Sequence, residues 1–86
     1  MTKRSVQINL KNGLEASPVA LLVQEASKYE STIYIQAGDK IVNAKSIMGM
    51  MSLGLDNGEE LEVSANGTDE LAAVEGIENF LSGKEA

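Results

Sequence analysis

The sequence predicts an α+β domain: an open-faced two-layer sandwich in which three helices cover one face of a four-stranded antiparallel sheet. Three observations support this prediction. Apolar and polar residues alternate along the expected strands, as they do in sheets with one buried face. Two longer segments repeat apolar residues at helical spacing. The elements follow one another in the order β-α-β-β-α-β-α within 86 residues, which is the length of one domain.

The first strand and the first long helix are expected before residue 30. In residues 5–10 every second side chain is apolar, and Asn12-Gly13 follows as a turn signal. Residues 16–28 form the expected helix, because Pro18 suits a first helical turn and apolar side chains recur at spacings of three and four. The side chains on this apolar face are Val19, Leu22, Val23 and Ala26.

Two paired strands are expected next, at 31–37 and 40–43. The first is rich in β-branched and aromatic residues, and Gly38-Asp39 between them suits a two-residue hairpin turn. A second turn at residues 56–58 leads into the fourth strand, expected at 60–65, where apolar and polar residues again alternate. The sheet therefore has its four strands.

The last helix is expected to start after Thr68 or Asp69, either of which is a suitable N-cap residue. Gly76 lies within this helix and is expected to cost a little stability, because glycine is a poor helix former. The expected buried face consists of Leu71, Val74, Ile77, Phe80 and Leu81.

Composition excludes several classes of function. Thirteen acidic residues against seven basic ones give a net charge of −6, which argues against direct binding of nucleic acid or of an anionic membrane. The chain has no cysteine and no histidine, so the commonest metal ligands and general base are missing. We expect no cofactor, no metal site and no enzymatic activity. With no signal peptide or membrane-spanning segment apparent, a cytoplasmic location is expected.

The most informative stretch is residues 42–54. Ser46 is well placed to cap a short helix, and three of the four methionines lie within the next five positions. A helix this short cannot bury all of its apolar side chains, so some of them are expected at the surface, where methionine adapts to several partners. From Lys40 to Leu55 there are two lysines and no acid, so a phosphate on Ser46 would meet little repulsion. The simpler interpretation is an ordinary cap followed by core methionines.

Residues 42–54, "VNAKSIMGMMSLG", resemble the regulatory-serine segment of the HPr family, the small phosphocarrier proteins of the bacterial sugar phosphotransferase system. Residues 12–26, "NGLEASPVALLVQEA", resemble its active-site segment. The family carries a phosphoryl-accepting histidine at the position of Glu15 and an arginine at that of Ser17. Both residues are replaced here. Glu15 also has a purely structural interpretation, because the positive end of the helix dipole stabilises an acidic side chain in the first turn.

The sequence has Ser46 but lacks the histidine at position 15. In this combination it resembles one branch of the family, the catabolite-repression HPr homologues called Crh. This resemblance implies that HPr kinase/phosphorylase modifies Ser46 and that the product acts as corepressor for a LacI-type catabolite control protein. It implies that Lys45 helps to balance the phosphate and that Ile47, Met48 and Met51 contact the partner. Those homologues usually have arginine at position 17, where it helps to bind partners.

Two alternatives remain open at this point. A carboxylate can form an acyl phosphate, so the chain could be a phosphocarrier that uses Glu15 and exchanges phosphate with other phosphotransferase-system proteins. It could also be an interaction module that binds through its methionines without being phosphorylated.

Overall fold

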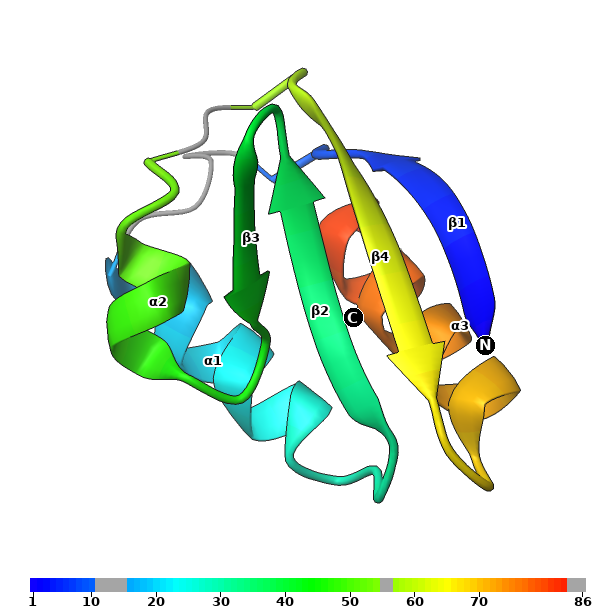
Figure 1. The fold of residues 1–86 in the computed structure, drawn as a ribbon. Coiled ribbons are helices and arrows are strands. Elements are labelled where there is room, and N and C mark those ends of the chain that lie inside the picture. Colours follow the sequence, from blue (N-terminus) through cyan, green and yellow to red (C-terminus); the bar gives the residue numbers. More distant parts are fainter. Residues whose placement is uncertain (11–15, 55–56, 84–86) are drawn as a thin grey trace.

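The computed structural model describes residues 1–10, 16–54 and 57–83, and it contains the predicted elements in the predicted order. These residues form four strands and three helices in the order β-α-β-β-α-β-α (Figure 1). The strands are β1 (Thr2–Gln7), β2 (Thr32–Ala37), β3 (Lys40–Asn43) and β4 (Glu60–Asn66). The helices are α1 (Ala16–Ala26), α2 (Ile47–Met51) and α3 (Glu70–Leu81).

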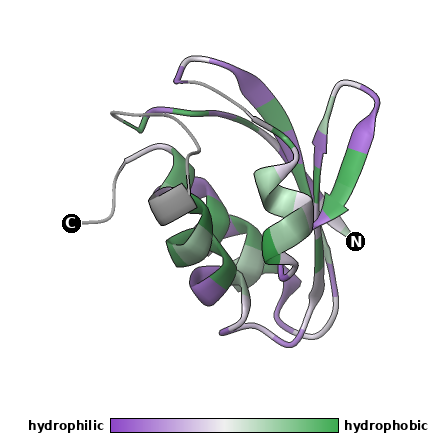
Figure 2. Ribbon diagram, turned by 90° about the vertical axis from the view of Figure 1, so that its left-hand side faces the viewer, coloured by the Kyte–Doolittle hydropathy of each residue, from purple (hydrophilic) through white to green (hydrophobic). Residues whose placement is uncertain are grey.

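The four strands form one antiparallel sheet in the order β1-β4-β2-β3. A two-residue turn joins β2 to β3, with Ala37 opposite Lys40, and Gly38 adopts the positive φ of 61° that such turns need. Figure 2 shows the helices on one side of the sheet and the other side uncovered. Helices α1 and α3 pack against each other, and α2 packs on α1 and β3. The predicted open-faced sandwich is therefore confirmed.

The core lies between the sheet and the helices. The apolar side chains of β4 at positions 61, 63 and 65 are buried, and the glutamate and serine between them are not. This alternation is the reason that one face of the sheet can meet the helices while the other meets water. The fully buried larger side chains are Ile8, Val19, Leu22, Ile33, Ile35, Met50, Val63, Val74, Ile77 and Leu81. In the described part of the chain, no helix is long and apolar enough to cross a membrane.

Two details differ from the sequence-based expectation. The first strand starts at Thr2 rather than Ser5, and Ile8 follows its end, where its N–H donates to the carbonyl of Glu59 at 2.9 Å. Leu71 was expected in the core, but its side chain is 65% exposed and Ala73 is buried instead. At about 100° per residue, Leu71 lies about 60° from Val74 on one side, whereas the buried Ala73 and Ile77 lie on the other side, so Leu71 falls outside the buried face of α3.

A close contact between α1 and α3 explains Gly76. The hydroxyl of Tyr29 donates to Oε2 of Glu25 at 2.9 Å, and the ammonium of Lys28 contacts Oε1 of this buried carboxylate at 2.9 Å. A Cβ atom built on Gly76 collides with the Tyr29 hydroxyl. The glycine that lowers the helix propensity of α3 is thus the residue that makes room for the partly buried hydrogen bond between Tyr29 and Glu25.

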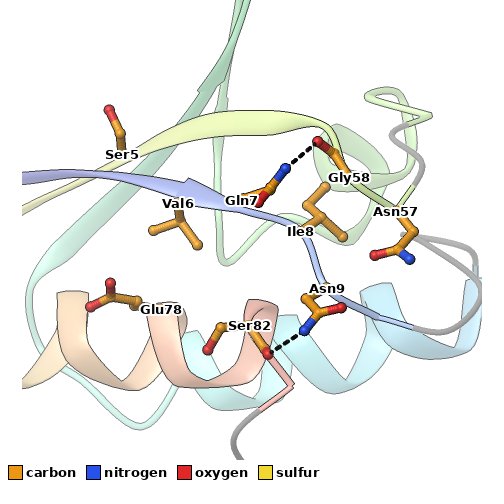
Figure 3. A pocket seen from close by; sticks show the side chains of 9 residues that line it. All are labelled: Ser5, Val6, Gln7, Ile8, Asn9, Asn57, Gly58, Glu78 and Ser82. Carbon is orange, nitrogen blue, oxygen red and sulfur yellow. Dashed lines mark hydrogen bonds between the residues drawn. The ribbon is translucent and has the colours of Figure 1, made fainter.

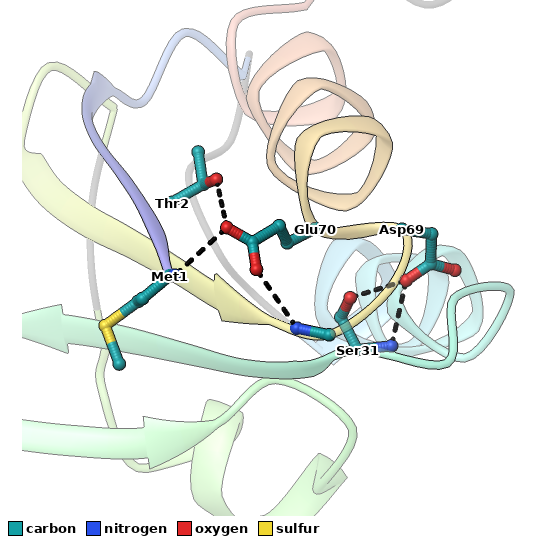
Figure 4. A network of polar contacts seen from close by, with 6 residues as sticks. Met1, Thr2, Ser31, Asp69 and Glu70 are labelled. Carbon is teal, nitrogen blue, oxygen red and sulfur yellow. Dashed lines mark hydrogen bonds and ion pairs between the residues drawn. The ribbon is translucent and has the colours of Figure 1, made fainter.

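The start of α3 is joined to the β2 side of the sheet by a polar network (Figure 4). Asp69 occupies the N-cap position, but its carboxylate makes no bond to the helix. It instead accepts hydrogen bonds from the hydroxyl and N–H of Ser31 and from the N–H of Glu30. The bond from the Ser31 hydroxyl, followed by the Glu30 N–H, lowers the pKa of Asp69 below its usual value. Asp69 therefore ties the helix start to the turn between α1 and β2.

Glu70, the next residue, connects the start of α3 to β1 and to the loop before the helix. Its Oε1 accepts the Gly67 N–H at 3.2 Å, and its Oε2 accepts the Thr2 hydroxyl at 2.6 Å. These bonds, with that from Thr2 the largest, lower the pKa of Glu70 below its usual value. Asp69 thus connects the start of α3 to the turn before β2, and Glu70 connects it to β1.

Candidate functional site

Ser46 lies where the chain turns from β3 into α2. Asn43 shapes this turn: its side-chain oxygen accepts the Lys45 N–H at 2.8 Å and its carbonyl accepts the Ser46 N–H at 3.0 Å. Ser46 has the extended backbone of an N-cap residue, with φ −104° and ψ 112°, and its Oγ accepts the Gly49 N–H at 3.2 Å. The predicted cap is confirmed, and the serine is exposed.

The apolar side chains of α2 divide into two groups. Met50 is fully buried and packs in the core. Ile47, Met48 and Met51 are 44%, 78% and 51% exposed, and we call these three the α2 patch. Eight large apolar side chains are exposed in the part of the chain that the structure describes, and three of them belong to this five-residue helix. Met50 is therefore a core residue, whereas the α2 patch forms an apolar surface beside Ser46.

The two lysines around α2 both bind backbone carbonyls. The Lys45 ammonium donates to the carbonyl oxygen of Tyr29, in the turn after α1, at 2.7 Å. The Lys40 ammonium donates to the carbonyl of Ser52, at the end of α2, at 3.0 Å. The contact between Lys45 and Tyr29 was not predicted, because a carbonyl acceptor has no signature in the sequence. Because of this contact, the ammonium of Lys45, which is next to Ser46 in the chain, is bound to the turn after α1.

The other predicted site is only partly described. Glu15 lies outside the described residues, and Ser17 lies in the first turn of α1. Helix α1 packs against α2, so the structure brings the helix that begins at this segment close to the element capped by Ser46. Lys45, Ser46 and the α2 patch all lie within residues 45–51.

A separate hollow of about 450 Å³ lies between β1 and α3 (Figure 3). Its wall includes the amide side chains of Gln7 and Asn9, which donate to the carbonyls of Gly58 and Ser82 at 3.0 and 3.3 Å. These amides are thus used to hold the chain together. None of the predicted site residues lines this hollow, and among the described residues there is no group of carboxylates arranged to hold a metal ion.

The fold is that of a small HPr-like domain. Residues 2–83 match the family model described as "PTS HPr component phosphorylation site". The chain is 44% identical over 81 residues to the HPr-like protein Crh of Halalkalibacterium halodurans, covering 94% of this chain and 96% of that protein. It is 43% identical over 81 residues to Crh of Bacillus subtilis, with coverage of 94% and 95%.

A comparison with solved structures agrees with the sequence match. The crystal structure of HPr-C-His from Thermoanaerobacter tengcongensis superimposes with a TM-score of 0.90 at 43% sequence identity, and the match covers 100% of both chains. The chain belongs to the HPr family, as its two characteristic segments predicted. The relatives named Crh are similar to it over nearly their whole length.

Proposed function

We propose that this chain is a non-enzymatic, cytoplasmic regulator of carbon catabolite repression that is switched by phosphorylation of Ser46. HPr kinase/phosphorylase adds the phosphate, and the phosphorylated surface binds a LacI-type catabolite control protein as its corepressor. The repressor, not this acidic chain, contacts the DNA. The observation that carries the proposal is the position of an exposed, helix-capping Ser46 beside the exposed α2 patch.

The surroundings of Ser46 are suited to such a switch. The segment from Lys40 to Gly54 contains two lysines and no carboxylate, so a phosphate here meets cations rather than like charge along the chain. The α2 patch supplies apolar area next to the new charge, and a combination of aliphatic contact with charge-assisted hydrogen bonds is typical of a regulated interface. Lys45 is the side chain we assign to the phosphate, and Ile47, Met48 and Met51 are assigned to the partner.

Phosphoserine at position 46 is expected to tighten binding to the catabolite control protein by about tenfold or more over the unmodified chain, because each charge-assisted contact adds roughly 1.5 to 3 kcal/mol. Met48→Ala is expected to weaken the phosphorylated form by about tenfold, as the most exposed member of the patch. Titration calorimetry with the purified repressor measures both effects.

Leu71→Ala is the matched control, because Leu71 is also a large apolar side chain that is mostly exposed but lies on α3, and its loss is expected to leave the affinity unchanged. Equal affinities with and without the phosphate would overturn the proposed switch. If Met48→Ala still weakened binding in that case, the chain would be an interaction module that does not depend on phosphorylation.

A further inference from the structure

One peptide group connects residues 42–54, which we call the regulatory segment, with the start of α3. This is the peptide between Tyr29 and Glu30, in the turn that follows α1. Its carbonyl oxygen accepts a hydrogen bond from the Lys45 ammonium at 2.7 Å. Its N–H donates to Oδ2 of Asp69 at 2.9 Å. The peptide therefore lies between a cation on one side and a carboxylate on the other.

This arrangement makes the two hydrogen bonds mutually supporting. A cation at the carbonyl draws electron density toward oxygen and makes the N–H of the same amide a better donor, so bonds in series strengthen each other. Asp69 also holds the N–H and hydroxyl of Ser31 and occupies the N-cap position of α3 (Figure 4). Lys45 is thus linked to α3 through this peptide and Asp69.

The bond made by Lys45 is the one that a new anion nearby would replace most readily. Its acceptor is a neutral carbonyl, whereas a phosphate on Ser46 carries a negative charge of about 1.5 to 2 and adds charge–charge attraction to the hydrogen bond. The lysine side chain is flexible, half-buried, and attached to the residue next to Ser46. Lys40 makes the same kind of bond, but to the Ser52 carbonyl at the C-terminal end of α2, whereas Ser46 caps the N-terminal end.

We propose that a phosphate on Ser46 takes the Lys45 ammonium away from the Tyr29 carbonyl and thereby weakens the link from the regulatory segment to Asp69 and α3. The proposal rests on the function proposed above, which supplies the phosphate. It adds an internal consequence: modification of Ser46 changes the turn after α1 and the start of α3, as well as the surface beside the serine.

The test uses a dipeptide that occurs once in the chain. Tyr29-Glu30 is the only tyrosine followed by glutamate, so carbonyl-¹³C tyrosine combined with ¹⁵N glutamate gives a single amide-to-carbonyl correlation in the NMR spectrum. That signal reports the carbonyl bonded to Lys45 and the N–H bonded to Asp69. Phosphoserine is introduced at position 46 during translation, so the measurement does not depend on whether HPr kinase accepts the chain.

In the wild-type chain, phosphoserine is expected to move the carbonyl signal upfield, to the position that Lys45→Met produces without the phosphate. In Lys45→Met itself, phosphoserine is expected to cause no further shift. Lys40→Met is the matched control and is expected to respond to phosphoserine as the wild type does. An unchanged wild-type signal, or an equal shift with and without Lys45, would overturn the proposal.

This outcome is separate from that of the proposed function. A carbonyl shift in a chain that the repressor ignores would keep the internal link and remove the corepressor role. Tight, phosphate-dependent binding to the repressor with no carbonyl shift would keep the corepressor role and remove the internal link.

Discussion

Replacement of Met50 by alanine is expected to lower the free energy of unfolding by about 2 to 5 kcal/mol, which is the usual range for truncating a fully buried methionine. Met50 is the side chain of α2 that is fully inserted into the core. Its loss leaves a cavity beneath the helix and removes the fully buried side chain by which α2 packs in the core. Urea denaturation followed by circular dichroism measures the change.

Met48→Ala and Met51→Ala are the controls for Met50→Ala, since they remove the same chemical group from the same helix. Both side chains are exposed, and each substitution is expected to change the stability by less than about 0.5 kcal/mol. A similar loss of stability in all three variants would contradict the division of α2 into one buried anchor and a surface patch.

Gly76→Ala is expected to destabilise the protein by about 1 to 3 kcal/mol, even though alanine is the better helix former by about 1 kcal/mol. The added methyl group collides with the Tyr29 hydroxyl and disturbs its bond to the buried Glu25. Thermal and urea denaturation measure the effect. A more stable Gly76→Ala variant would show that α1 and α3 are less closely packed than the structure has them.

The substitution Tyr29→Phe tests whether the collision with the Tyr29 hydroxyl causes the loss of stability in Gly76→Ala. Alone it removes one partly buried hydrogen bond and is expected to cost about 1 kcal/mol. Combined with Gly76→Ala it also removes the colliding oxygen, so the double variant is expected to be more stable than the sum of the two losses predicts. Simple additivity would assign the effect of Gly76→Ala to another part of the helix.

The fold could be predicted because its local patterns and its global packing agree. The alternation in β4 and the helical spacing in α1 specify which faces are buried, and the structure buries those faces. Leu71 shows the limit of this reasoning, because at a helix end the direction of the buried face depends on how the helix lies on the sheet. Gly76 shows another limit, since only the packing of α1 on α3 reveals its purpose.

The candidate site could be predicted in outline but not in its contacts. The position of Ser46 as a cap follows from residue type and spacing, as does the expectation that some apolar side chains of α2 are exposed. The choice of Met50 as the buried one does not, because its neighbours have the same chemistry. The partner of Lys45 is a backbone carbonyl far away in the sequence, and every residue type offers that acceptor.

The intact mass of the chain after treatment with phosphate donors tests the central claim most directly. Wild type and Ser46→Ala are each incubated with HPr kinase/phosphorylase and ATP, and separately with enzyme I and phosphoenolpyruvate. We expect one added phosphate on the wild type with the kinase, none on Ser46→Ala, and none on either with enzyme I. A wild-type chain that the kinase leaves unmodified, or a phosphate from enzyme I that persists in Ser46→Ala, would contradict a regulator switched at Ser46.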